Sequence, residues 1–204
     1  MSIDSRSPLE FKLTELPSSL SNKCTIRFLP STHTGISDNT NSSINMAHGK
    51  YIKIMFQDDL LAHNEVLEEI SQTLDASRRV WLVSASDHLD EIKQLRGPIF
   101  IPKLKKGLFI GNNSISSPSV VAFRSSAFLE FERSLSLMMD CEWYVRMLHN
   151  YGKPVILKKV AVINRLHSNQ AQHSLKSYLA EEIEKVKKLH NKTSMRKTGC
   201  LCRS

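Results

Sequence analysis

Short β-rich runs alternate with stretches of helical periodicity along most of the chain. The first pair is an apolar run at 51–56, typical of a buried strand, and a segment at 64–74 whose apolar residues at 67, 70 and 74 share one helix face. Later runs predict strands at 80–83, 120–123 and 154–163, and helices at about 140–150 and 175–190. This alternation predicts an α/β fold in which helices flank a sheet.

Size and composition are those of a globular protein. The chain has 204 residues, of which 24% are charged and 41% hydrophobic, and a domain of this size buries roughly 70% of its unfolded surface. Its apolar runs are far shorter than the ~18 to 20 residues that cross a bilayer, and charged residues occupy the first 20 positions, where a signal peptide is apolar. We therefore expect a cytoplasmic protein. The cysteines, Cys24, Cys141, Cys200 and Cys202, lack the spacing of a disulfide framework.

Positive charge is concentrated at the C-terminus. The net charge is +8, and no acidic residue follows Glu184, whereas seven Lys and Arg residues do. One interpretation is a solvated helix end and tail, and another is peripheral contact with anionic lipid at the inner face of a membrane, or attraction to a phosphate-bearing substrate. Nucleic acid is the weakest alternative, because no recognised binding motif accompanies the basic residues.

Two adjacent carboxylates, Asp58 and Asp59, directly follow the apolar run at 51–56. Like charges at a strand end are costly to bury unless a cation compensates them. If 51–56 is a central strand, the pair lies at the carboxyl edge of the sheet, where open α/β sheets bind ligands. Mg²⁺ or Mn²⁺ together with a diphosphate suits such a pair. Alternatively, Asp59 caps the following helix and Asp58 is solvated.

Three blocks of sequence, in order, resemble the family 2 inverting glycosyltransferases. The block at 35–61 has a Gly, a later Asn, Ala-x-Gly, a Tyr-Ile strand and paired Asp residues. The block at 111–128 is similar to the segment in which the family's acceptor side re-enters the sheet, and 139–152 with 165–170 resembles its catalytic-base helix and Arg-x-His end. Each motif is weak, but the ordered set is fairly specific. The resemblance implies a GT-A-like, Rossmann-like mixed sheet flanked by helices.

By this resemblance, Asp58 and Asp59 hold a metal ion, Mg²⁺ or Mn²⁺, and the diphosphate of a nucleotide-sugar donor, with Asp59 the more direct ligand. Asp140 is then the general base. An inverting transfer needs one carboxylate to take a proton from the acceptor hydroxyl while the metal stabilises the departing diphosphate. Asp140 has an alternative interpretation as a first-turn residue that complements a helix dipole.

The resemblance gives further residues to the donor and metal sites. Asn41 lines the donor pocket, Arg165 neutralises a phosphate, His167 contacts the metal or the diphosphate, and Asp4 reaches the base or ribose. Arg165 has the alternative of pairing with a surface acid, and His167 that of a structural histidine. The family often has a basic residue before the Asn, where this chain has Thr40, which weakens the expected diphosphate clamp.

On the acceptor side, the resemblance implicates Arg124 and Trp143. Trp143 shares the predicted helix with Asp140 and is placed to stack on an acceptor sugar. Its helical spacing to Met147 instead favours packing in the core.

The expectation for the whole chain is a metal-dependent, inverting glycosyltransferase that transfers a sugar to a hydroxyl of a glycan or lipid-linked acceptor in polysaccharide biosynthesis. Residues 1–174 form its catalytic domain and 175–204 a basic helix and tail. Compared with the family, the first strand and helix are missing, so the domain is expected to be N-terminally truncated. The rivals are a non-catalytic remnant or binding module of the same fold and a basic nucleic-acid-binding protein.

Overall fold

The computed structural model describes residues 27, 35–90, 95–166 and 178–199. Asp4 and His167, two of the expected site residues, lie outside this part of the chain. The described helices and strands are α2 (Ile36–Asn45), β1 (Tyr51–Lys53), β2 (Asp59–Leu61), α3 (Val66–Asp75), β3 (Trp81–Asp90), β4 (Leu95–Arg96), β5 (Val121–Arg124), α4 (Met139–Tyr151), β6 (Val155–Leu166) and α6 (Leu179–Gly199).

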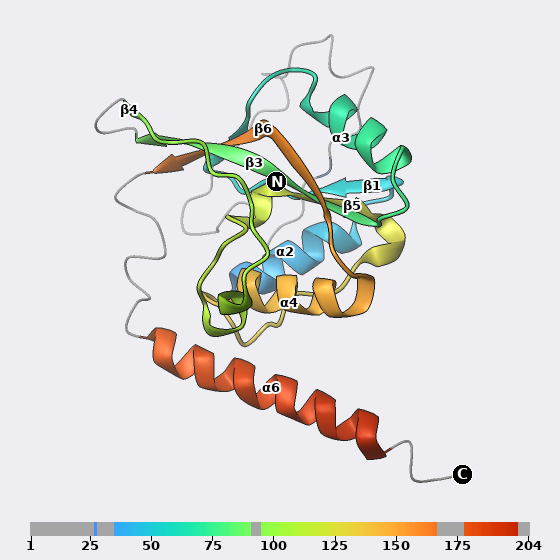
Figure 1. Ribbon diagram of the computed structural model, residues 1–204, viewed down its shortest axis with the longest axis vertical. Coiled ribbons are helices and arrows are strands. Elements are labelled where there is room, and N and C mark those ends of the chain that lie inside the picture. Colours follow the sequence, from blue (N-terminus) through green and yellow to red (C-terminus); the bar gives the residue numbers. More distant parts are fainter. Residues whose placement is uncertain (1–26, 28–34, 91–94, 167–177, 200–204) are drawn as a thin grey trace.

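The strands form one mixed sheet, which confirms the α/β fold. Their order is β1-β5-β3-β6-β2, with β4 added to β3. The β3–β6 pair is parallel and the other pairs are antiparallel. Figure 1 shows α3 on one side of the sheet and α2 and α4 on the other, with α6 beyond α4.

The expectation of a central strand at 51–56 is wrong. Within the described sheet, β1 is the first strand of the order and ends at Lys53. The next residues stay close to the β5 side, because Ile54 N donates to Val121 O and Phe56 N to Ser119 Oγ. A turn then closes with Asp59 N donating to Phe56 O at 3.1 Å. Asp59 is therefore the first residue of β2, at the other end of the strand order.

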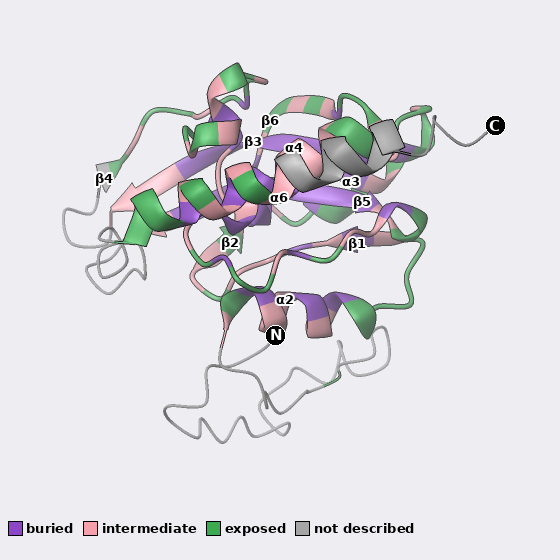
Figure 2. Ribbon diagram, turned by 90° about the horizontal axis from the view of Figure 1, so that it is seen from below, coloured by how far each residue is buried: buried purple, intermediate pink, exposed green. Residues whose placement is uncertain are grey.

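The core lies between the sheet and α4 and is rich in aromatic side chains, with the buried residues grouped along the inner surfaces of these elements (Figure 2). Trp143 of α4 stacks on Phe131 with ring centroids 5.0 Å apart and meets Trp81 of β3 edge-on at 6.3 Å. Because large aromatic rings bury the most apolar area per residue, this cluster fixes α4 against the sheet.

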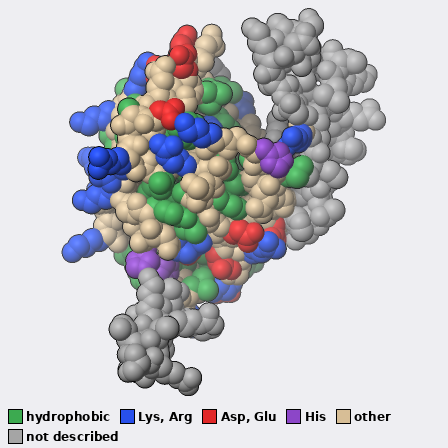
Figure 3. All heavy atoms as spheres, turned by 90° about the vertical axis from the view of Figure 1, so that its right-hand side faces the viewer, with side chains coloured by type: hydrophobic (Ala, Val, Ile, Leu, Met, Phe, Trp, Pro, Cys, Tyr) green, Lys and Arg blue, Asp and Glu red, His purple; other side chains and the backbone are tan. Residues whose placement is uncertain are grey.

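The C-terminal helix α6 is packed onto the rest of the fold. Val186 is fully buried and Glu182 is 6% exposed, whereas Lys185 and Lys187 pair with acidic residues of the same helix. Lys and Arg side chains also gather at one edge of the face shown in Figure 3, so the described positive charge is not confined to α6. None of the described helices combines the length and apolar character needed to span a membrane.

Candidate functional site

Asp59, at the start of β2, is held by polar side chains from two other segments. Ser117 Oγ donates to Asp59 Oδ2 at 3.2 Å. Ser117 Oγ also accepts from Asn164 Nδ2 at 2.9 Å, and Asn164 is the β6 residue directly opposite Asp59 in the antiparallel register. The carboxylate therefore sits where β2, β6 and the chain entering β5 meet.

Arg165 of β6 contacts the turn that carries the Asp pair, through two hydrogen bonds to the backbone of that turn. Its Nε donates to Asp58 O at 2.7 Å and its Nη2 donates to Gln57 O at 3.3 Å. The guanidinium thus fixes the turn that carries both carboxylates and places a positive charge next to them. A guanidinium in this position suits an anionic ligand.

Asp140 occupies the first turn of α4 and has both carboxylate oxygens engaged. Oδ1 accepts from Cys141 N at 2.6 Å, and Oδ2 accepts from Asn113 Nδ2 at 2.6 Å. Burial raises the pKa of Asp140 from 3.8 to about 6, and these hydrogen bonds act in the opposite direction. A pKa close to the working pH is what a general base requires.

A hydrogen-bonded bridge, formed by side chains and the Ser116 backbone, joins the two carboxylates. Asn113, which binds Asp140, also donates to Ser116 O at 2.9 Å. Ser116 Oγ donates to Asn164 Oδ1 at 3.3 Å, and Asn164 binds Ser117, the donor to Asp59. Residues from β2, β6, α4 and the loop before β5 are therefore organised as one polar site. Asn113, Ser116, Ser117 and Asn164 were not singled out from the sequence.

Ser116 adopts a strained backbone conformation at the centre of this bridge. Its φ is 98°, in the left-handed region that non-glycine residues rarely adopt. Its N–H donates to Asn113 Oδ1 at 3.0 Å and its carbonyl accepts from the Tyr144 hydroxyl at 3.0 Å, so several partners impose the conformation. Strain held in place in this way is concentrated at functional sites.

Lys53 is a further charged group near Asp59 that the sequence did not reveal. Its ammonium donates to the carbonyls of Ser119 and Ile54. Burial lowers the pKa of Lys53 to about 7, and the negative charge of Asp59 works against that shift. The charge of Lys53 therefore depends on the ionisation of the neighbouring Asp59 carboxylate.

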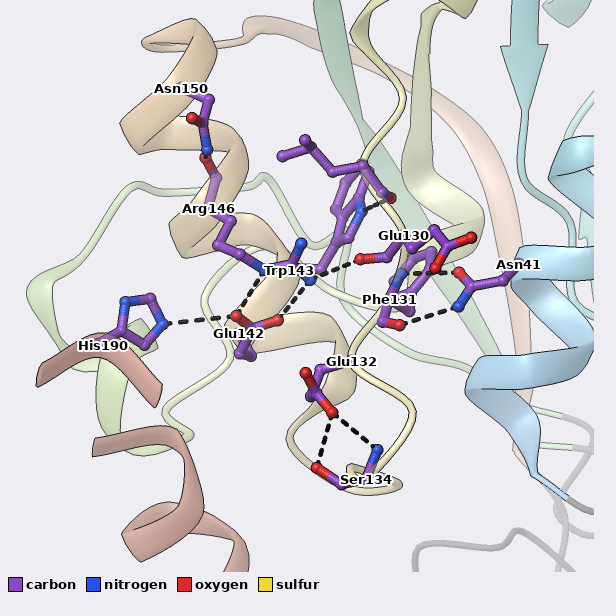
Figure 4. Close-up of polar contacts among 11 residues, drawn as sticks. Asn41, Glu130, Phe131, Glu132, Ser134, Glu142, Trp143, Arg146, Asn150 and His190 are labelled. Carbon is purple, nitrogen blue, oxygen red and sulfur yellow. Dashed lines mark hydrogen bonds and ion pairs between the residues drawn. The ribbon is translucent and has the colours of Figure 1, made fainter. Parts of the chain in front are cut away.

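Two expected ligand-binding residues instead have packing roles. Asn41 is 1% exposed, and its amide exchanges two hydrogen bonds with the Phe131 backbone, at 2.9 Å and 2.7 Å (Figure 4). Trp143 is fully buried, and its Nε1 donates to Leu129 O at 2.7 Å. A ring enclosed by the core has no face for a sugar, so the packing alternative for Trp143 is the correct one.

Arg124 is at the opposite end of the sheet from Asp59. It pairs with Tyr51 in the β1–β5 register, whereas Lys53, the β1 residue nearest the site, pairs with Ala122. The Arg124 guanidinium donates to Leu74 O at 2.7 Å and to the Tyr51 hydroxyl at 3.2 Å. It therefore binds a carbonyl in the last turn of α3 and is not brought together with Asp140.

The carboxylates do not form a complete metal cage by themselves. Within the described residues, no group of three or more His, Cys, Asp or Glu side chains is arranged to hold a metal ion. Asp58 and Asp59 supply carboxylate oxygens, the ligand type that Mg²⁺ and Mn²⁺ prefer, and Mg²⁺ is commonly held by one or two carboxylates plus substrate phosphates. The residues present fit a metal that binds together with a diphosphate.

The mixed sheet and its flanking helices are those of a GT-A-like α/β fold. No family model and no curated protein matches the chain. The solved structures that match include those of TarS from S. aureus, a glycosyltransferase. TarS 1–349 aligns with a TM-score of 0.56 and 15% identity, over 72% of this chain and 45% of that one.

The complex of TarS 1–349 with UDP-GlcNAc aligns with a TM-score of 0.54 and 14% identity, over 74% of this chain and 44% of that one. The longer TarS structure aligns with a TM-score of 0.53 and 15% identity, over 80% of this chain and 30% of that one. The chain thus spans less than half the length of these TarS chains, and at such identities the likeness establishes the fold.

Proposed function

We propose that the chain is a glycosyltransferase that transfers a sugar from a nucleotide-diphosphate-sugar donor to a hydroxyl group, with inversion at the sugar carbon and with Mg²⁺ or Mn²⁺ as cofactor. The proposed acceptor is a glycan or a lipid-linked glycan, as in polysaccharide biosynthesis at the inner face of a membrane. The resemblance to family 2 glycosyltransferases supports the inverting, metal-dependent form of the reaction.

The observation that carries the proposal is the bridge between Asp59 and Asp140. The two carboxylates come from segments about 80 positions apart in the sequence, yet one hydrogen-bonded network of Asn and Ser residues, which passes through the Ser116 backbone, holds both. Transfer with inversion needs two such groups, one at the donor diphosphate and one at the acceptor hydroxyl. On a GT-A-like sheet this arrangement favours glycosyl transfer over a non-catalytic binding role.

Asp140 is assigned the role of general base. With a pKa of about 6, its carboxylate is mostly ionised near neutral pH and is a stronger base than an ordinary aspartate. Asn113 and the Cys141 N–H each bind one oxygen of the Asp140 carboxylate and fix its orientation. Each oxygen keeps a second lone pair, which can accept the proton of the acceptor hydroxyl. Asp140 takes the proton from the acceptor hydroxyl as that oxygen attacks the sugar carbon.

Asp58 and Asp59 are assigned to the metal and the donor diphosphate. A bound divalent cation supplies charge stabilisation for the departing diphosphate. Because the described carboxylates are too few to enclose a metal, Asp58 and Asp59 would hold one only together with the donor phosphates, and metal binding is expected to depend on the nucleotide. Arg165 and Lys53 add positive charge at the same edge. TarS has been crystallised with UDP and with UDP-GlcNAc, so UDP-GlcNAc is the first donor to test.

The test is nucleotide-dependent thermal stabilisation. UDP, GDP, dTDP and CMP are each added with and without Mn²⁺, and the melting temperature is measured for the chain, for Asp59→Asn and for Asp75→Asn. A ligand at 100 times its Kd stabilises by ~2.7 kcal/mol, which for a chain of this size is a rise of roughly 5–10 °C. We expect a rise that requires Mn²⁺ and Asp59 but persists in Asp75→Asn, an exposed carboxylate beside Lys50.

Transfer is then measured with the donor so identified. Asp140→Asn is expected to keep the nucleotide-dependent rise and to lose transfer, since general-base catalysis contributes about 10²- to 10⁴-fold. Absence of any nucleotide effect on the unmodified chain, or undiminished transfer by both Asp59→Asn and Asp140→Asn, contradicts the proposal.

A further inference from the structure

The helix α6 presents a stripe of side chains, each four residues from the next, to the rest of the fold. Glu182 is 6% exposed, Val186 is fully buried, and His190 contacts Glu142 of α4. Residues spaced by four lie on one face of a helix. The neighbouring Glu181 points away and pairs with Lys185 of its own helix at 2.8 Å. The stripe therefore defines the side of α6 that is attached to the fold.

Glu182 binds the backbone that leads into α4. Its Oε1 accepts from Ser136 N at 2.9 Å, and its Oε2 accepts from Leu137 N at 2.9 Å and from Met138 N at 2.8 Å. The N-cap residue of α4, Met138, makes no side-chain cap hydrogen bond of its own. A buried carboxylate that accepts three N–H groups makes strong, charge-assisted bonds and favours the positive end of the helix dipole. Asp140 is two residues after Met138, the last of these three backbone donors.

A second contact fixes α6 further along α4. His190 Nε2 lies 3.5 Å from Glu142 Oε1, and Arg146 donates to both Glu142 oxygens at 2.6 Å and 2.7 Å (Figure 4). The His190 ring also meets Phe109 edge-on at 5.3 Å. Glu182, the buried Val186 and His190 therefore place contacts with the rest of the fold along eight residues of one face of α6, which defines the position of the Glu182 carboxylate.

The same helix also borders the loop that supplies Asn113. Gly111, two residues before Asn113, is packed so closely that an added Cβ would lie 2.6 Å from Met138 Sδ and 3.7 Å from Leu179 Cδ1. Met138 is thus bound through its N–H by Glu182 and touches the Asn113 loop through its sulfur. Both groups that hold Asp140, the start of α4 and Asn113, therefore rest on the first turn of α6.

We propose that Glu182 is a positioning residue for Asp140, and that the C-terminal helix α6 is in this way a working part of the transfer site. This inference rests on the proposed function, since it concerns the base of that reaction. Glu182 does not meet the substrate. It fixes the turn before α4, and that turn fixes the direction in which the Asp140 carboxylate faces the acceptor.

The test compares Glu182→Gln with Glu181→Gln in the full chain. The glutamine amide has one oxygen for three N–H groups, and its own N–H groups face other donors, so the turn is expected to shift. A displacement of about 1 Å at a reacting group costs up to about 10²-fold in rate. We expect kcat to fall about 10- to 100-fold in Glu182→Gln, with the KM for the donor and the Mn²⁺-dependent nucleotide affinity unchanged. Glu181→Gln, on the exposed side of α6, is expected to transfer normally.

A purely stabilising role for Glu182 gives a different result. The rates are measured well below the melting temperature of each variant, where the folded fraction is complete by circular dichroism. A fully folded Glu182→Gln with unchanged kcat overturns the inference while leaving the proposed function intact. If Glu182→Gln does not fold, Glu182→Asp, which keeps the charge on a shorter side chain, is expected to fold and to show an intermediate loss of kcat.

A second measurement does not depend on activity. The pKa of the Asp140 carboxyl, followed by NMR, is expected to fall from about 6 toward its ordinary value of 3.8 in Glu182→Gln, because a displaced α4 start exposes the carboxyl to water. The unmodified chain and Glu181→Gln are expected to give the same high value. If the unmodified chain transfers no sugar, the proposed function fails, and this pKa still decides the positioning role: an unchanged value in Glu182→Gln overturns it.

Discussion

Replacement of Asp140 by Asn is expected to have opposite effects on activity and on stability at neutral pH. The Asp140 pKa is raised from 3.8 to about 6 by burial, and a shift of this size corresponds to about 3 kcal/mol. The folded protein holds this proton more tightly than the unfolded chain does. The contribution of Asp140 to stability therefore falls as the pH rises from about 4 to about 6. Above about pH 6 the folded protein bears the full free-energy cost of keeping this buried carboxyl ionised.

In Asp140→Asn this penalty is absent at every pH. The amide has one oxygen where the carboxylate used two, so an unfavourable contact with Asn113 or with the Cys141 N–H remains, but that cost does not vary with pH. The quantity to measure is thus the difference in unfolding free energy between variant and unmodified chain. We expect that difference to move in favour of the variant by about 2.5 kcal/mol between pH 4 and pH 8.

The assay is urea denaturation at a series of pH values, followed by circular dichroism. Asp87→Asn is the control, because the Asp87 pKa is shifted in the opposite direction: Arg96, 2.8 Å away, lowers it. The stability that Asp87 contributes is therefore present above its ordinary pKa and is lost as the pH falls. The difference between Asp87→Asn and the unmodified chain is therefore expected to stay nearly constant between pH 4 and pH 8 and to move in favour of the variant only below about pH 4. A pH-independent difference for Asp140→Asn, or one that moves against the variant, refutes the assignment of a raised Asp140 pKa.

Three further predictions concern other residues of the site and its surroundings. Asn113→Ala removes a hydrogen bond that lowers the Asp140 pKa, so the acidic limb of the kcat-versus-pH profile is expected to move upward by about one pH unit. The control variant Asn112→Ala is expected to leave that limb in place. Arg124→Ala is expected to lower the unfolding free energy by about 1–2 kcal/mol in urea titrations, with the KM for the acceptor unaltered; a raised KM would restore the acceptor role. Burial raises the pKa of the Cys141 thiol, so peptide mass spectrometry is expected to find Cys141 unmodified by iodoacetamide at pH 8 until the chain is unfolded.

Elements with a strong apolar pattern were predictable from the sequence, and those with buried polar residues were not. The helices α3 and α4 and the strand β6 lie within a few residues of their predicted ranges because apolar side chains mark their inner faces. The strand β3 continues to Asp90, well past the predicted end at 83, because Ser84, Ser86 and Asp87 are buried polar residues that interrupt the apolar run. The helix α2 was missed for the same reason: its buried face consists of Ser37, Asn41 and Ile44.

The site shows a similar division. Asp59 stands out in the sequence because a pair of carboxylates after an apolar run requires an explanation, whereas Asp140 was singled out only through the resemblance to family 2 glycosyltransferases. Asn113 and Asn164 do not stand out, because their roles depend on partners that folding brings from other segments. A run of Asn and Ser before β5 is typical of a turn, and the sequence contains nothing that says which groups the turn will join. Glu182 is equally hidden, since on sequence grounds it is one of several acidic residues at a helix start.

The position of β6 in the sheet has a consequence for folding. It is the last described strand along the chain, yet it lies between β3 and β2, and among the described strands β2 pairs with β6 alone. Parallel pairing of distant segments, here 82–90 with 155–166, is slow because a long loop must close first. Until β6 enters the sheet, Asp59 has no neighbouring Asn164, and the bridge to Asp140 is incomplete. A partly folded or partly synthesised chain therefore contains both carboxylates without the assembled site, and the proposed nucleotide binding is expected only after β6 has entered the sheet.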